Sequence, residues 1–314
     1  ESMRGPGEAP APISRNREFT LYGVGIAAVA VIWALVQYQD VIQTLLIVSG
    51  LGLLGYVVYE AFKLDPHARD RIFAILFLIA LNPVFWGLFE QAGGSLNLYT
   101  DRFVDRAGVP ASIFQSINPI YIILLAPLFA WLWTALGKRG LEPCAPAKFG
   151  LALLQVGAGF LVFVVGANSV GTSAMTPVMF VFLIYLLHTT GELCLSPVGL
   201  SAMNRLAPKF MASLIMGAWF YMTAVGNFVA GKIGEATGGH DGEMTKEGTL
   251  QVYNTIGWWT VGIAVVVIAL SPFVKKLMHL DTLKDDDRLA GREELAEPQA
   301  PGMFPQGETS PRNA

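Results

Sequence analysis

Residues Val178 to Met203 read VMFVFLIYLLHTTGELCLSPVGLSAM, a long apolar run in which Glu192 is the one Asp, Glu, Lys or Arg. A helix needs about 20 apolar residues to cross a hydrocarbon core of about 30 Å. This run exceeds that length and is rich in residues that form helices. It therefore predicts a membrane-spanning helix with a single acid well inside it.

Seven further apolar runs surround this one, and the chain is 53% hydrophobic and 14% charged. With a mean hydropathy of +0.50, it has too little polar surface to cover a soluble globule. Buried helices of a large soluble protein are the alternative, but eight such runs in succession argue against it. The sequence predicts an all-α integral membrane protein with spans at Phe19–Gln37, Val41–Phe62, Ile72–Leu98, Ile113–Leu136, Phe149–Ala167, Val178–Met203, Ala212–Ile233 and Leu250–Phe273.

The pattern divides the chain into four parts. Residues 1–18 are polar, contain Gly and Pro, and are expected to be a linker that follows something upstream. Residues 19–66 hold two spans separated by Tyr38-Gln39-Asp40, which predicts an antiparallel hairpin. Residues 67–280 are expected to form a six-helix bundle. Residues 281–314 mix charges with prolines and are expected to be disordered.

Basic residues accumulate in alternate loops, whereas the loops between them hold far fewer. Because Lys and Arg gather in short cytoplasmic loops, this alternation supports the eight spans and predicts that both ends of the chain are cytoplasmic. The net charge of −3 gives no sign of a nucleic-acid partner. The basic set comprises Arg15, Arg17, Lys63, Arg69, Arg71, Lys138, Arg139, Lys148, Arg205, Lys209, Lys275 and Lys276.

Glu192 heads a polar stripe in its span. At 100° per residue, Tyr185, Thr189, Glu192 and Ser196 share one helix face, and His188 flanks it. An acid at membrane depth costs about 2.5–3.5 kcal/mol on insertion scales, so the stripe should face the bundle interior or a wet cavity. The alternative is a static hydrogen-bond network around a protonated carboxyl.

Two other polar sites interrupt the spans. Asn82, Trp86 and Glu90 recur every four residues and share a face, which combines an aromatic ring with an acid. Packing of Trp86, with Glu90 at the membrane boundary, is the alternative. Asn118 is the third site, although a lone Asn more often makes a helix–helix hydrogen bond. No Lys or Arg lies deep in any span, so neither acid has an evident cationic partner in this chain.

The sequence offers no pattern typical of an enzyme. It contains no GxxxxGK[ST] loop, no HExxH, no GxSxG and no cluster of metal ligands. Cys144 and Cys194 suggest neither a disulfide framework nor a metal site. We therefore predict a protein without catalytic residues, cofactor or metal.

Four motifs resemble the proton-dependent oligopeptide transporters of the major facilitator superfamily, in order and at similar separations. FWGLFEQ at 85–91 resembles FWxxxEQ, and FQSINP at 114–119 resembles FQSxNP. GELCLSPVGLS at 191–201 resembles GELxxSPxGLS, and MGAWF at 216–220 resembles MGxWF. The resemblance covers about Phe19 to Leu280. Bacterial members carry two extra helices between their six-helix halves, which fits the hairpin expected at 19–66.

The resemblance implies half of a transporter, because the amino-terminal motifs of the family are missing. The implied fold is a six-helix carboxy-terminal bundle, and the implied function is symport of di- and tripeptides with protons across a bacterial inner membrane. The implied partners are peptide, protons, lipid and a separate amino-terminal half. Alternatives are another small solute, or a non-transporting membrane scaffold or receptor.

The resemblance also assigns roles to individual residues. Glu192 is similar to the acid that receives the amino terminus of the peptide, aided by Asn118 and Ser196. Glu90 resembles the acid tied to proton binding. Trp86 and Trp219 resemble the aromatic residues that line the pockets for peptide side chains.

Overall fold

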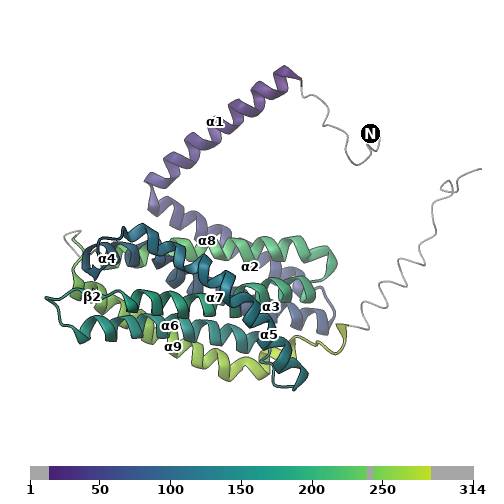
Figure 1. Cartoon of the computed structure of the whole chain (residues 1–314). Helices are drawn as coiled ribbons and strands as arrows, with labels where there is room; N and C mark the ends of the chain where they lie inside the picture. Colours follow the sequence, from purple (N-terminus) through teal and green to yellow (C-terminus); the bar gives the residue numbers. More distant parts are fainter. Residues whose placement is uncertain (1–13, 239–242, 284–314) are drawn as a thin grey trace, which may run out of the picture. The chain divides into compact units, whose positions relative to one another are not determined.

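A computed structural model describes residues 14–238 and 243–283 of the chain (Figure 1). These residues include eight helices that are long and apolar enough to cross a membrane, which confirms the predicted count and the all-α membrane fold. The chain divides into two compact units at Tyr59. The expected linker and tail lie mostly outside the described residues, and their boundaries stay predictions.

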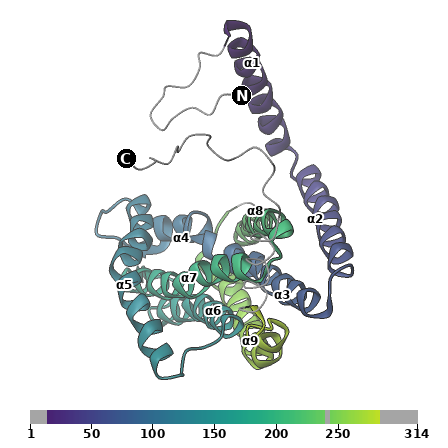
Figure 2. The same ribbon diagram turned by 90° about the vertical axis from the view of Figure 1, so that its right-hand side faces the viewer.

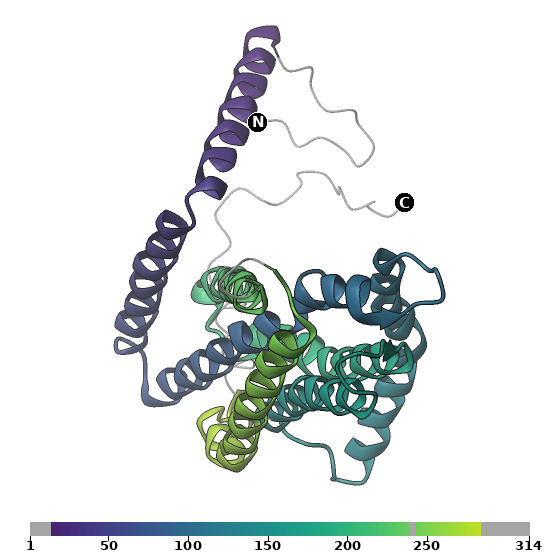
Figure 3. The same ribbon diagram turned by 90° about the vertical axis from the view of Figure 1, so that its left-hand side faces the viewer.

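The first unit contains α1 (Arg15–Gln37) and most of α2 (Gln39–Ala61). Figures 2 and 3 show α2 following α1 rather than lying beside it, and the hairpin expected at 19–66 stays a prediction. The expected turn is almost absent, because Gln39 and Asp40 already belong to α2 and Tyr38 alone separates the helices. Antiparallel neighbours usually need a connection of about 2–8 residues.

The second unit is a bundle of long helices. α6 packs most extensively against α9 and α7, α3 packs against α8, and α5 leans on α7. The elements in chain order are α3 (Pro66–Phe89), η1 (Glu90–Ala92), α4 (Ser95–Phe103), β1 (Val104–Asp105), η2 (Ala111–Ser116), α5 (Ile117–Lys138), α6 (Ala145–Ser169), β2 (Thr176–Pro177), α7 (Met179–Leu206), η3 (Lys209–Met211), α8 (Ala212–Thr237) and α9 (Lys246–Leu277). The short parallel pair of β1 with β2 was not predicted.

The third span is not one helix, although the sequence predicts one from Ile72 to Leu98. α3 ends at Phe89, a 3₁₀ turn follows, and α4 starts again at Ser95. Gln91 stabilises this break, because its Nε2 donates to the carbonyl oxygens of Gly87 at 2.9 Å and Ala230 at 3.0 Å. The break cannot be recognised in the sequence because the apolar run continues across it. The break places Glu90 at the end of α3.

Beyond the break, α4 is tied to other helices. The Ser95 hydroxyl lies 2.6 Å from Gln91 Oε1 and 2.8 Å from the Tyr253 hydroxyl on α9. The Tyr99 hydroxyl lies 3.0 Å from Thr176 Oγ1, in the short strand before α7. α4 is therefore held by α9 and by the chain that leads into α7.

Glycine allows the closest helix contacts. A Cβ on Gly226 of α8 would lie 2.7 Å from Trp86 Cβ and 3.3 Å from Pro83 Cα, both on α3. A Cβ on Gly157 of α6 would lie 2.9 Å from the carbonyl oxygen of Gly257 on α9. Membrane helices associate through such small residues because lipid provides no hydrophobic driving force between them.

We expect Gly226→Ala to destabilise the bundle, because the new methyl group would meet a Cβ and backbone atoms that cannot rotate away. Overpacking costs about 1–3 kcal/mol, which would lower the unfolding temperature in detergent by about 5 °C. Gly231→Ala is the matched control on the same helix, since nothing lies within 4 Å of its added Cβ. Equal melting temperatures for the two variants would contradict this packing.

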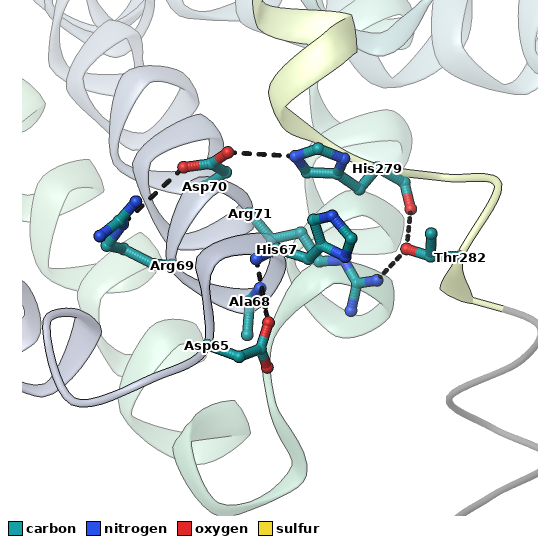
Figure 4. A network of polar contacts seen from close by, with 8 residues as sticks. All are labelled: Asp65, His67, Ala68, Arg69, Asp70, Arg71, His279 and Thr282. Carbon is teal, nitrogen blue, oxygen red and sulfur yellow. Dashed lines mark hydrogen bonds and ion pairs between the residues drawn. The ribbon is translucent and has the colours of Figure 1, made fainter.

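A polar network joins the two ends of the bundle sequence (Figure 4). Asp65 caps α3 by accepting from the backbone N–H groups of the first turn. Asp70 Oδ2 lies 3.1 Å from His279 Nε2, and Arg71 Nη2 donates to Thr282 Oγ1 at 2.6 Å. The start of α3 and the segment after α9 are thus fastened together at one end of the bundle.

Candidate functional site

The structure brings Glu192 and Asn118 into contact. Glu192 lies on α7, and its Oε2 accepts a hydrogen bond from Asn118 Nδ2 of α5 at 3.0 Å. The same Nδ2 lies 3.1 Å from Thr189 Oγ1, one turn earlier on α7. Two polar sites that the sequence gives on separate spans therefore form one cluster, and both Glu192 and Asn118 are only half-buried.

The start of α5 positions Asn118 for this contact. Asn118 and Pro119 lie in the first turn, where a proline costs little because these N–H groups have no partner within the helix. Ile117 is buried and anchors the turn. On α7, the Thr189 hydroxyl donates to the Tyr185 carbonyl oxygen at 2.7 Å, which leaves its lone pairs toward Asn118.

The other polar residues on this part of α7, Tyr185, His188 and Ser196, have different surroundings. The Tyr185 hydroxyl donates to the Ala92 carbonyl oxygen at 3.4 Å, so it ties α7 to the turn after α3. His188 is 2% exposed and packs between Phe160 and Phe89, at ring-centroid distances of 5.0 and 6.1 Å. Ser196 Oγ is buried and has no hydrogen-bond partner within the described residues.

Glu90 is exposed and stands where α3 ends. Its neighbours contact α7 on both sides, since Phe89 meets His188 and Ala92 meets Tyr185. This places Glu90 at the point where the third span meets the part of α7 that leads to Glu192. The two acids therefore belong to one site.

The two tryptophans expected to line the side-chain pockets, Trp86 and Trp219, lie on different helices, α3 and α8. Asn82 is fully buried and donates to the Trp219 carbonyl oxygen at 3.0 Å and to Thr223 Oγ1 at 2.9 Å, so it faces α8. Trp86 is half-buried, and its Nε1 has no partner in the described part of the chain. Trp219 is 3% exposed and packs on Gly199. Trp86 packs against Phe85 and Phe89 of its own helix.

Neither acid has a cationic partner in the structure. Within residues 14–238 and 243–283, the ion pairs involve other acids on helix ends and loops, and none includes Glu90 or Glu192. A membrane carboxylate is costly without a partner, so such acids pair, take up a proton or face water. Glu90 and Glu192 therefore need a proton, water or a cation from outside the described residues to offset their charge.

The comparison with protein families decides the affiliation of the chain. The model of the POT family matches residues 21–250, which include all four motifs and both acids. The chain belongs to the POT family. It is a multi-pass membrane protein of that family, with the candidate site on the helices that carry the motifs.

Several relatives in the POT family are similar to this chain. The peptide transporter YePEPT of Yersinia enterocolitica is 40% identical over 196 residues, which cover 60% of this chain and 38% of the relative. The uncharacterized transporter YclF of Bacillus subtilis is 32% identical over 280 residues, which cover 86% of this chain and 55% of the relative. This chain spans about half the length of the relatives that it matches.

Solved structures of POT family transporters are similar to this chain over about half of their length. The peptide transporter POT in complex with alafosfalin has a TM-score of 0.65 at 28% identity, covering 85% of this chain and 55% of that one. A POT family transporter in complex with 5-aminolevulinic acid has a TM-score of 0.65 at 26% identity, covering 84% of this chain and 56% of that one.

The POT family motif FWGLFEQ contains a residue that sequence reasoning did not single out. Gln91 follows Glu90 directly and connects through Ser95 to Tyr253. Its spacing of four residues to Ser95 was the available signal. These buried hydrogen bonds fix the backbone next to Glu90.

Proposed function

We propose that this chain supplies the carboxy-terminal half of a transporter that carries di- and tripeptides together with protons by alternating access. The contact between Glu192 and Asn118 carries the proposal. It holds a half-buried carboxyl group by a neutral amide, and no cation among residues 14–238 and 243–283 pairs with it. Such a carboxylate can accept the ammonium group of a peptide amino terminus.

The chemistry of a peptide fits this arrangement. Asn118 donates to Oε2, which orients the carboxylate and leaves Oε1 for an incoming N–H donor. Ser196, whose hydroxyl is buried without a described partner, would add a second polar contact. Trp86 would border the peptide side chains, and Trp219, whose ring is buried against Gly199, would join it only after the packing of α7 and α8 changes. Cationic residues of the other half would hold the peptide carboxylate.

Glu90 is proposed as the proton-coupling residue. Its neighbours Phe89 and Ala92 contact the part of α7 that leads to Glu192. Two carboxylates that share one site repel when both are charged, so protonation of one favours the ionised form of the other. Proton binding at Glu90 therefore changes how well Glu192 binds an ammonium group. This gives proton and peptide a common site through which each affects the other.

We place the transporter in a bacterial inner membrane, with both ends of this chain in the cytoplasm. The alternation of basic loops supports this orientation. This orientation can be tested by labelling single cysteines introduced at exposed positions between the spans, such as Lys209 and Glu243. Lys209 should be labelled from the cytoplasmic side and Glu243 from the opposite side.

A second cargo is favoured by one observation. A relative of 26% identity has been solved in complex with 5-aminolevulinic acid, a small solute that also carries an amino group and a carboxylate. The same carboxyl cluster would receive that amino group. Competition between 5-aminolevulinic acid and a dipeptide for uptake distinguishes the two cargoes.

The test of the proposed function is peptide-driven proton movement. Proteoliposomes that contain both halves should show proton influx when a dipeptide is added outside, and none when the peptide amino group is acetylated. If the rate of proton influx is the same with and without the dipeptide, the result would favour a scaffold or receptor that does not transport.

We expect Glu90→Gln to reduce proton-driven accumulation of a dipeptide at least tenfold while counterflow exchange falls less than threefold. The amide keeps the size of the side chain but cannot take up the proton, whereas exchange of peptide for peptide needs no net proton transfer. Glu243→Gln, at an exposed loop position, is the control and should change neither. Equal loss in both assays would show that Glu90 is structural.

A further inference from the structure

We propose that a cavity at the end of the bundle where α3 begins and α9 ends binds a phosphate group. The cavity has a volume of about 420 Å³ and lies among the end of α5, the start of α6 and the ends of α7 and α9. Its walls include Trp133, Lys148, Arg205 and Lys275. It begins one residue beyond Ser196 on α7 and is no part of the peptide site.

The charge of the cavity favours an anion. Lys148, Arg205 and Lys275 line it together with one acid, Glu142, which leaves a net charge of +2 from three cations and one carboxylate. Lys148 is 6% exposed, and its ammonium group is already paired with Glu142. Arg205 and Lys275 make no ion pair with any residue that the structure describes, so two positive charges remain for a ligand.

Neutral donors in the wall point to an oxygen ligand. Trp133 Nε1 is buried and has no acceptor within the described residues, which is costly for an N–H group. Cys144, the N-cap of α6, makes no side-chain cap, so the N–H groups of the first turn at Ala145 and Ala147 lack that partner. The 25-residue helix α6 also directs the positive end of its dipole here.

These groups match phosphate in number and kind. An Arg guanidinium and an ammonium neutralise its charge, and its oxygens can accept from an indole N–H and from backbone N–H groups. Lys148 stacks 4.3 Å above the Trp133 ring, which holds the indole in place. Basic cavities between membrane helices at the cytoplasmic surface suit the headgroups of anionic lipids.

Two sources can supply the phosphate, an anionic phospholipid or soluble inorganic phosphate. The purified 314-residue chain is studied by native mass spectrometry after reconstitution in phosphatidylglycerol and phosphatidylcholine mixtures. We expect it to retain phosphatidylglycerol in preference to phosphatidylcholine. Displacement by millimolar inorganic phosphate would assign the site to soluble phosphate, and resistance to it would assign the site to the lipid.

The charge requirement is tested with matched double variants. Arg205→Gln with Lys275→Gln should lower the retention of phosphatidylglycerol about tenfold or more. Arg139→Gln with Lys276→Gln removes the same charge from exposed positions outside the cavity and should change it less than twofold. Equal loss in both double variants would overturn the proposal, because it would show general attraction of lipid to a basic surface.

A milder variant avoids any effect on folding. Trp133→Phe keeps the ring but removes the N–H group, and it should weaken retention severalfold. Trp131→Phe, on the same helix but 65% exposed, is the control and should have no effect. Unchanged retention in Trp133→Phe would remove the indole from the site, and absence of any phosphate ligand on the unmodified chain would refute it. Glu192→Gln should leave retention intact, so this result stands apart from peptide transport.

Discussion

Glu192→Gln should lower dipeptide uptake at least thirtyfold in the transporter assembled from both halves, without reducing its insertion into the membrane. The amide keeps the shape of the side chain and can still contact Asn118, but it loses the negative charge that meets the peptide ammonium group. Breaking a buried, hydrogen-bonded charge pair costs about 2–5 kcal/mol, which corresponds to a factor of about thirty or more.

The measurement is uptake of a labelled dipeptide at equal membrane abundance, with Glu243→Gln as a control for loss of one carboxylate at an exposed position. Acetylated dipeptide, which carries no ammonium group, should be a poor substrate of the unmodified protein. Uptake above half the parental level in Glu192→Gln would show that the amino terminus binds elsewhere.

The 314-residue chain by itself should insert into membranes and fail to transport peptide. Transporters of this kind move one six-helix half against the other around a site near the midplane, so one half has neither a closed cavity nor a surface to move against. Glu90 and Glu192 would also lack the cations that we expect from the other half. Uptake should therefore stay at the background of empty vesicles.

Proteoliposomes under an inward proton gradient provide the test, with this chain alone and with an amino-terminal half of a POT relative added as a separate polypeptide. Restored, gradient-dependent uptake would support the proposed division of the cavity. Gradient-dependent uptake by this chain alone would refute it and would require two copies that together form a cavity.

Much of the fold could be predicted because membrane solvation leaves a strong mark on sequence. Eight long apolar runs were sufficient to identify the eight spans, although several polar helix ends were cut short and the break in the third span was missed. α9, for example, continues from Leu250 back to Lys246, because apolar length reports the span and not the helix. The helix face shared by Thr189 and Glu192 was also predictable from helical periodicity.

Other features depend on contacts that periodicity does not encode. The break at Glu90 depends on the Gln91 side chain reaching the carbonyl oxygens of Gly87 and Ala230, the second of which lies far along the chain. The meeting of Asn118 with Glu192 depends on how α5 leans on α7. Trp219 shares the character of a pocket residue, but Gly199 leaves a space that buries its ring.

The break after Phe89 divides the third span into two helices, α3 and α4, with Glu90 at the point where they meet. α3 packs on α8, whereas α4 is held by Tyr253 and Thr176, so we expect the break that begins at Glu90 to act as a hinge between two separately anchored helices. A stiffer hinge, as in Gly93→Ala with Gly94→Ala, should slow exchange and accumulation equally. That outcome differs from the selective loss expected for Glu90→Gln, and a selective loss in the glycine variant would argue against a hinge. The proposed proton site therefore lies at the boundary between two helices that are anchored to different neighbours.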